Sequence, residues 1–218
     1  MIILNFKTYE SGTGQNAVTM AKICEEVAKE SGVKIIPAVQ ALNIEKVAAV
    51  VKIQVFAQHV DAIEYGANTG KILPVEIKAA GAKGSLLNHS ENTIMAKEIL
   101  TGIDILKKLD MTSIVCTKSP SESAMVAKFG PDYIAVEPPE LIGSGRSVTK
   151  AKPQVITKTI EQVLKIDKIP VLCGAGIVNG DDVKKALELG AEGILIASAV
   201  MKADNPKDVL MDLCTGFD

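Results

Sequence analysis

The feature that most constrains the fold is a regular alternation of short apolar runs and amphipathic segments along the chain. Runs such as residues 133–136 and 170–172 have no polar alternation, which is typical of parallel strands that are buried on both faces. Segments such as residues 12–31 place Val, Ile and Ala at helical spacing, with Lys and Glu between them. The unit recurs eight times without a Pro- or Ser-rich linker, which favours a closed barrel over an open, doubly wound sheet.

The predicted elements are distributed along the whole sequence. We expect strands at residues 2–6, 33–39, 54–58, 85–87, 112–116, 133–136, 170–172 and 194–197. We expect helices at residues 12–31, 43–50, 71–80, 92–109, 121–129, 152–164, 180–189 and 206–213. The sequence therefore predicts an α/β protein with one domain, a single closed (β/α)8 barrel over residues 1–218.

Charge and cysteine content argue against several classes of partner. The net charge is −2 and no basic stripe is present, so neither nucleic acid nor an anionic membrane is an expected partner. No apolar run approaches the roughly 20 residues that cross a bilayer, and the first residues do not resemble a signal peptide. Four widely spaced cysteines indicate free, buried thiols in a cytoplasmic protein: Cys24, Cys116, Cys173 and Cys214. With two histidines, a histidine-built metal site is not expected.

Polar and small residues follow several of the predicted strands. In a (β/α)8 barrel the carboxyl ends of the strands meet at one mouth, where the functional groups lie. Those residues are Asn5 and Lys7 after the first strand, His89 and Glu91 after the fourth, Glu137 after the sixth, Gly174, Ala175 and Gly176 after the seventh, and Ala197 and Ser198 after the eighth. Each could be a solvated charge, a core histidine or a tight turn. Their occurrence at one mouth favours a shared site.

Glu137 begins a segment with special backbone requirements. Pro138 and Pro139 follow it, and a proline holds the residue before it in extended geometry. Gly143, Ser144 and Gly145 come soon afterwards. A stiff start and a glycine-rich end predict a loop that moves as a lid. The alternative is a surface turn with an exposed acid.

The chemistry of these groups indicates a type of reaction. A carboxylate and an imidazole suit proton transfer next to a carbonyl group. Loops of small residues that present backbone N–H groups at helix N-termini suit a phosphate. Together they predict an enzyme that acts on a phosphorylated carbonyl compound.

The chain resembles the triosephosphate isomerase family. The motifs that carry the resemblance run in family order: Asn5-Phe6-Lys7, Ala57-Gln58, Gly66-Ala67-Asn68-Thr69-Gly70, Asn88-His89-Ser90-Glu91, Val136-Glu137-Pro138-Pro139, Ile142-Gly143-Ser144-Gly145, Cys173-Gly174-Ala175-Gly176 and Ala197-Ser198. Asn88 stands where glycine is usual, and Cys173 and Gly176 replace the tyrosine and serine that normally latch the lid. These departures resemble the archaeal branch of the family.

The resemblance implies a TIM barrel that interconverts dihydroxyacetone phosphate and D-glyceraldehyde 3-phosphate in glycolysis and gluconeogenesis. This family is the standard example of a glutamate base paired with a neutral imidazole. The implied roles are Glu137 as base, His89 as the group that polarises the carbonyl oxygens, Lys7 as the cation, Asn5 in substrate positioning, Ser90 and Glu91 in orienting His89 and Lys7, and backbone N–H groups near Ile142, Gly143, Gly174, Gly176, Ala197 and Ser198 in phosphate binding. No metal and no cofactor are implied, because the substrate carbonyl itself acidifies the proton.

Residues 66–70 resemble the family loop that inserts into a neighbouring subunit beside its active site. Thr69 is the residue expected to reach across. The resemblance therefore implies a homo-oligomer of at least two subunits, and archaeal relatives often have four.

Two other functions fit part of the pattern. A Schiff-base aldolase with Lys7 as nucleophile is one, but it leaves Glu137 without a role. A non-catalytic binder of phosphorylated ligands is the other, and it predicts phosphate binding without proton exchange at carbon.

Overall fold

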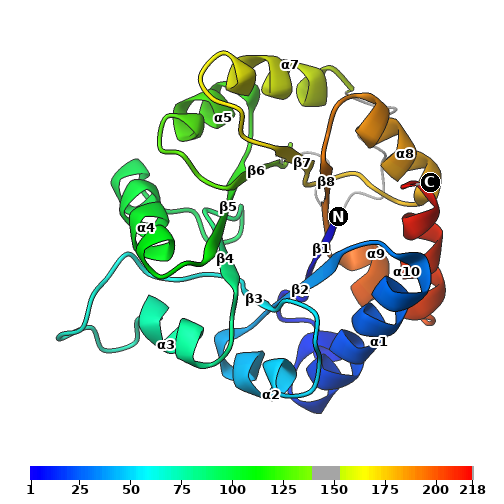
Figure 1. Ribbon diagram of the computed structural model, residues 1–218, viewed down its shortest axis with the longest axis horizontal. Helices are drawn as coiled ribbons and strands as arrows, with labels where there is room; N and C mark the ends of the chain where they lie inside the picture. Colours follow the sequence, from blue (N-terminus) through cyan, green and yellow to red (C-terminus); the bar gives the residue numbers. More distant parts are fainter. Residues whose placement is uncertain (139–152, 218) are drawn as a thin grey trace.

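The protein is a closed barrel of parallel strands in a computed structural model that describes residues 1–138 and 153–217. The strands follow one another around the barrel in chain order, and β1 pairs with both β2 and β8. Figure 1 looks down the barrel and shows the helices as an outer ring. The strands are β1 (Ile2–Asn5), β2 (Ile35–Val39), β3 (Phe56–Ala57), β4 (Gly84–Leu87), β5 (Thr112–Thr117), β6 (Tyr133–Val136), β7 (Val171–Cys173) and β8 (Gly193–Ile196). The predicted (β/α)8 barrel is confirmed.

The helices of the described residues follow the strands, and two of them come after the last strand. They are α1 (Gln15–Ser31), α2 (Ile44–Ala48), α3 (Pro74–Ala79), α4 (Ala96–Lys108), α5 (Pro120–Ala127), α7 (Pro153–Leu164), α8 (Gly180–Glu188), α9 (Ser198–Met201) and α10 (Pro206–Thr215), with short 3-10 helices η1 (Glu10–Gly12) and η2 (Ala41–Asn43). None of the described helices is long and apolar enough to cross a membrane.

The strands are buried on both faces, as their apolar sequences predict. Ile3 belongs to a small cluster inside the barrel that also contains Phe56 and Leu172. Its neighbours Ile2 and Leu4 belong to the larger cluster that includes buried side chains of the helices. Successive side chains of a strand point to opposite faces, so each strand supplies both clusters. This packing fixes where the strand ends lie.

Three helices begin three or four residues later than predicted: α1 at Gln15 instead of residue 12, α3 at Pro74 and α4 at Ala96. The N–H group of Ile94 donates to Asn88 Oδ1 (3.1 Å), and α4 begins at Ala96 instead of residue 92. The N–H group of Ile72 donates to Asp61 Oδ2 (2.7 Å), and α3 begins at Pro74 instead of residue 71. At α3 and α4 a loop side chain therefore holds the backbone just ahead of the helix, and at α3 Pro74 also keeps Leu73 in extended geometry.

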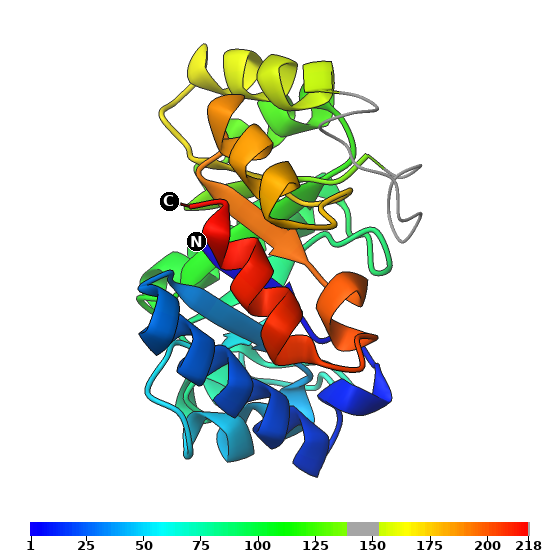
Figure 2. The same cartoon turned by 90° about the vertical axis from the view of Figure 1, so that its right-hand side faces the viewer.

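The ends of the chain complete the ring. Helix α9 was not predicted, because its four residues are too few for a periodic pattern. Helix α10 packs beside α1, as Figures 1 and 2 show. Lys207 of α10 contacts Glu26 and Glu30 of α1 at 2.8 and 2.9 Å. These contacts join the last helix to the first.

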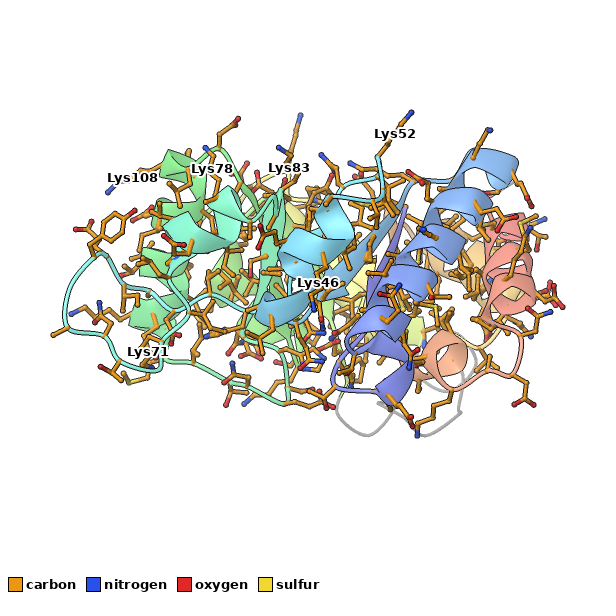
Figure 3. All side chains as sticks on the ribbon, turned by 90° about the horizontal axis from the view of Figure 1, so that it is seen from below. Lys46, Lys52, Lys71, Lys78, Lys83 and Lys108 are labelled. Carbon is orange, nitrogen blue, oxygen red and sulfur yellow. The ribbon has the colours of Figure 1, made fainter. Side chains whose placement is uncertain are left out.

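The two ends of the barrel are chemically different. Lys52 and Lys83 precede β3 and β4, and Lys108 ends the helix before β5. Figure 3 shows all three side chains projecting at the same end, where the strands begin. The residues predicted for the site follow the strands, so they belong to the opposite end.

Candidate active site at the carboxyl ends of the strands

An open pocket of about 530 Å³ lies at the mouth of the barrel. Residues after β1, β4, β6, β7 and β8 line it, as the sequence predicts. They include Lys7, His89, Glu137, Gly174, Gly176, Ala197 and Ser198. The closed barrel therefore gathers most of the predicted site residues into one cavity.

Lys7 has a left-handed backbone (φ 46°), which is unfavourable for a lysine. Side chains on both sides hold it there. Its N–H group donates to Asn5 Oδ1 (2.9 Å), and its carbonyl oxygen accepts from Gln58 Nε2 (2.9 Å). Lys7 Nζ contacts Glu91 Oε1 at 2.6 Å. Asn5 is buried, so the side-chain oxygen that accepts from the Lys7 N–H group is held in a fixed position.

His89 is buried, and its tautomer follows from its hydrogen bond. Nδ1 accepts from the N–H group of Glu91 (3.1 Å), so Nδ1 carries no proton and Nε2 carries it. Burial lowers the pKa of His89, the charge of Lys7 lowers it further, and the charge of Glu91 opposes both. The imidazole is therefore neutral near pH 7, with Nε2–H as a donor at the mouth of the barrel.

Glu137 is nearly inaccessible: its side chain is 4% exposed. Its N–H group donates to the carbonyl oxygen of Thr117 on β5 (2.7 Å), and its Oε1 lies 3.6 Å from His89 Nε2. Oε2 has no hydrogen-bond partner among the described residues. Burial raises the pKa of Glu137 to about 8, although the charge of Lys7 and the thiol of Cys116 oppose the shift. The alternative of an exposed surface acid is wrong.

Gly174 serves the carboxylate as well as the pocket wall. Its N–H group donates to the carbonyl oxygen of Val136 (2.9 Å), which places β7 against the end of β6. A Cβ atom at residue 174 would overlap Cγ of Glu137 and would lie 3.0 Å from that carbonyl oxygen. Glycine therefore leaves the space that the Glu137 side chain occupies.

From the sequence, Cys116 is expected only to be a free, buried thiol. The structure places Cys116 at the end of β5, where its buried side chain faces Glu137. Burial raises the pKa of Cys116 well above its usual value, and the Glu137 carboxyl adds to this. Cys116 ends a predicted strand, and this position could have indicated that it lies near the site. The apolar pattern of the strand does not show which face of the sheet the thiol occupies.

The remaining predicted residues fall in different places. Glu91 contacts both Lys7 and His89, and the backbone N–H of Ser90 faces Glu137. Thr69 is exposed on the loop between β3 and α3, which extends away from the barrel in Figure 1, and is not among the residues that line the pocket. Ile142 and Gly143 lie outside the described residues.

The described residues contain no cluster of three or more His, Cys, Asp or Glu side chains that could hold a metal ion. Glu137, His89 and Lys7 supply a carboxyl, an imidazole and an ammonium group to the pocket, the Glu91 carboxylate contacts Lys7, and the Cys116 thiol faces Glu137. Such a set can move protons and can stabilise a developing oxyanion.

Comparison with known proteins gives one consistent result. The family model described as "Triosephosphate isomerase" matches residues 1–216. The chain is 51% identical to the triosephosphate isomerase of Methanothermus fervidus, over 99% of this chain and 97% of that protein. It is 48% identical to that of Methanothermobacter thermautotrophicus, over 98% and 93%. A crystal structure of triosephosphate isomerase from Bartonella henselae has the same fold, with a TM-score of 0.77, 17% identity, and coverage of 99% and 98%.

Proposed function

The chain belongs to the triosephosphate isomerase family, and we propose that Glu137 is the base that moves the proton in its reaction. The enzyme interconverts dihydroxyacetone phosphate and D-glyceraldehyde 3-phosphate, a step of glycolysis and gluconeogenesis. One observation carries the proposal. A buried carboxylate, one of whose oxygens has no hydrogen-bond partner among residues 1–138 and 153–217, lies beside a neutral imidazole and a lysine, in a pocket with glycine-rich walls.

Burial gives Glu137 the properties of a proton carrier. A carboxylate removed from water is a stronger base, which is why its pKa rises to about 8. A base with a pKa near the working pH can both accept a proton and return it. Glu137 therefore takes the proton from one substrate carbon and delivers it to the neighbouring carbon.

His89 and Lys7 act on the charge that the proton leaves behind. Removal of the proton creates an enediolate, whose negative charge lies on the two oxygens. The neutral His89 ring still carries a proton on Nε2, so this N–H group can donate a hydrogen bond to these oxygens. Lys7 supplies a fixed positive charge, and Glu91 orients it through the 2.6 Å contact.

The walls after β7 and β8 are suited to the phosphate. Gly176 has a left-handed backbone (φ 68°), which turns the chain at the pocket. Ala197 and Ser198 follow β8 and line the same side. Backbone N–H groups near Gly174, Gly176, Ala197 and Ser198 hold the phosphate in this proposal, away from the carbons that react.

An assay with the full chain tests the function. Either triose phosphate is added, and its conversion to the other is followed with a dehydrogenase specific for the product. We expect turnover without added metal or cofactor. Binding of the triose phosphates without turnover would instead support a non-catalytic binder, and a covalent adduct trapped by borohydride would support a Schiff-base aldolase.

Replacement of Gly174 by alanine should lower kcat about tenfold. The new methyl group takes the space of Glu137 Cγ, so the carboxylate must move from its place beside His89. Gly130→Ala is the control: a Cβ atom there meets no atom within 4 Å, so this variant tests the cost of a methyl group on a positive-φ backbone (φ 68°) without any overlap. Equal kcat values for the two variants would show that Glu137 does not depend on the space at residue 174.

We also propose that the loop between β3 and α3 inserts into a second copy of the chain. Asp61 anchors the loop through the N–H group of Ile72 (2.7 Å) and Lys71 Nζ (3.0 Å). Between these anchors Tyr65 is 73% exposed, an unusual state for an aromatic side chain. Thr69 would then reach the partner's pocket, in a homo-oligomer of at least two subunits. The four cysteines are buried and none of them forms a disulfide, which supports a cytoplasmic location.

Light scattering should give a mass of at least two chains. Thr69→Glu places a charge in the inserted loop, so we expect dissociation and a lower kcat. Leu164→Glu changes another exposed residue, at the end of α7, and should keep both the mass and the rate. A fully active monomer would contradict the inserted loop.

A further inference from the structure

Asn88 has a backbone conformation that few side chains adopt. It precedes His89, it is buried, and its φ is 57°. Lys7 and Asp110 are the other non-glycine residues with a positive φ in the described part of the chain. Asparagine tolerates this conformation better than most residues. A glycine would adopt it easily, so the backbone alone does not explain why a side chain is present.

The Asn88 side chain joins three parts of the barrel mouth. Its Nδ2 donates to the carbonyl oxygen of Cys116 on β5 (2.9 Å) and, at 3.4 Å, to Glu122 Oε1 on α5. Its Oδ1 accepts from the N–H group of Ile94, in the loop after His89 (3.1 Å). Buried amides are stabilised by such bonds, and each lost bond leaves an unpaired group.

The α5 side of this network is well anchored. Ser119 caps the helix, with its Oγ accepting from the N–H group of Glu122 (3.2 Å). Glu122 Oε2 in turn accepts from the N–H group of Lys118 (2.8 Å). The carboxylate that meets Asn88 is thus held at the start of a capped helix.

We propose that Asn88 is a positioning residue that sets the location of His89 relative to Glu137. Two consecutive carbonyl groups of β5 carry the argument. The oxygen of Cys116 accepts from the Asn88 side chain, and the oxygen of Thr117 accepts from the backbone N–H of Glu137. Glu137 and the residue before His89 are therefore held by two adjacent residues of one strand, one residue for each.

The turn after Asn88 transmits this position to the imidazole ring. The N–H group of Asn92 donates to the carbonyl oxygen of His89 (2.7 Å), and that of Glu91 donates to His89 Nδ1 (3.1 Å). The turn is short, so a shift at Asn88 moves His89 and Glu91 together. Because Glu91 contacts Lys7, the shift also reaches the cation. The expected effect of Asn88 on kcat rests on the proposed function. Its expected effect on the position of His89 does not.

Asn88→Gly tests the proposal, with Asp110→Gly as a matched control. Both changes put glycine at a left-handed position, but Asp110 follows α4 at the far end of the barrel and is exposed. For Asn88→Gly we expect kcat to fall about tenfold, with KM changed less than about twofold. Thermal unfolding of both variants shows whether they are folded. Asp110→Gly should keep the kcat of the unsubstituted protein.

A second readout does not depend on catalysis. The chain has two histidines, so ¹⁵N NMR of the imidazoles gives two sets of signals, which His59→Gln assigns. Asn88→Gly should shift the signals of His89 and leave those of His59 in place. If Asn88→Gly does not fold, Asn88→Asp keeps the acceptor for Ile94 and loses the donor to Cys116, and the same changes are expected.

A variant of Asn88 that matches Asp110→Gly in either kcat or the His89 signals would overturn the proposal. Failure of the proposed function looks different. In that case the unsubstituted protein shows no isomerase activity, while the NMR comparison still reports whether Asn88 positions His89.

Discussion

Glu137→Asp is expected to lower kcat roughly 100- to 1000-fold, with little change in KM. The substitution keeps the charge and removes one methylene group, so the carboxylate withdraws from the pocket by more than about 1 Å. The backbone of Glu137 is fixed by its bond to Thr117, and the barrel cannot move to compensate. The phosphate is held by other loops, so substrate binding should survive.

Steady-state kinetics and calorimetry together check this prediction. Calorimetry with glycerol 3-phosphate, which has no carbonyl group, measures binding without reaction. The matched control is Glu188→Asp on α8, an exposed residue paired with Lys185, and it should leave kcat unchanged. Unchanged turnover in Glu137→Asp would remove the base from the mechanism. A parallel loss of binding and kcat would mean that the variant is not correctly folded.

Glu137→Gln is expected to make the protein more stable than the unsubstituted chain above pH 8. The pKa of Glu137 is raised from 4.5 to about 8, first because of burial. The folded chain therefore holds this proton more tightly than the unfolded chain does. The free energy of unfolding then falls as the pH rises from 4.5 through about 8. Each unit of pKa difference corresponds to about 1.4 kcal/mol, so the full effect is several kcal/mol.

Urea unfolding between pH 4 and 9 measures the effect. Near pH 4 both side chains are neutral, and the two proteins should have similar stability. At pH 9 glutamine should be more stable, because the charged carboxylate is absent. Other carboxyl groups, such as Asp61 with its lowered pKa, titrate in both proteins and cancel in the difference. Parallel stability curves over this range would mean that the pKa of Glu137 is not raised.

The barrel could be predicted because each strand and its end are determined by residues that are close together in the sequence. The run 133–136 is apolar and is followed by two prolines, so both its state and its end are fixed within a few residues. The structure has β6 at Tyr133–Val136. Eight such runs, with a helical segment after each, leave few ways to bury both faces of every strand. The location of Glu137 then follows from the closure of the barrel.

Contacts between distant segments could not be predicted in the same way. The loop ahead of α4 is held by Asn88, whose side-chain oxygen accepts from the N–H group of Ile94. Cys116 lies in β5 and faces Glu137, which follows the neighbouring strand β6, although twenty-one positions separate them in the sequence. Periodicity reports which face a residue occupies, but not which side chain it meets there.

Gly174 has one role that the sequence predicts and one that it does not. Its place in a small-residue loop predicts phosphate binding, and the structure puts it in the pocket wall. The need for space beside Glu137 Cγ could not be read from the sequence, since it arises from the pairing of β6 with β7. One residue therefore serves two requirements, of which only one has a sequence signature.

Isotope exchange measures whether Glu137 carries a proton between the two substrate carbons. Dihydroxyacetone phosphate is incubated with the protein in D₂O, and ¹H NMR follows deuterium entry at the carbons that exchange the proton. We predict rapid deuterium entry with the unsubstituted protein and almost none with Glu137→Gln, whose amide cannot accept the proton. Equal rates of deuterium entry for the two proteins would contradict it.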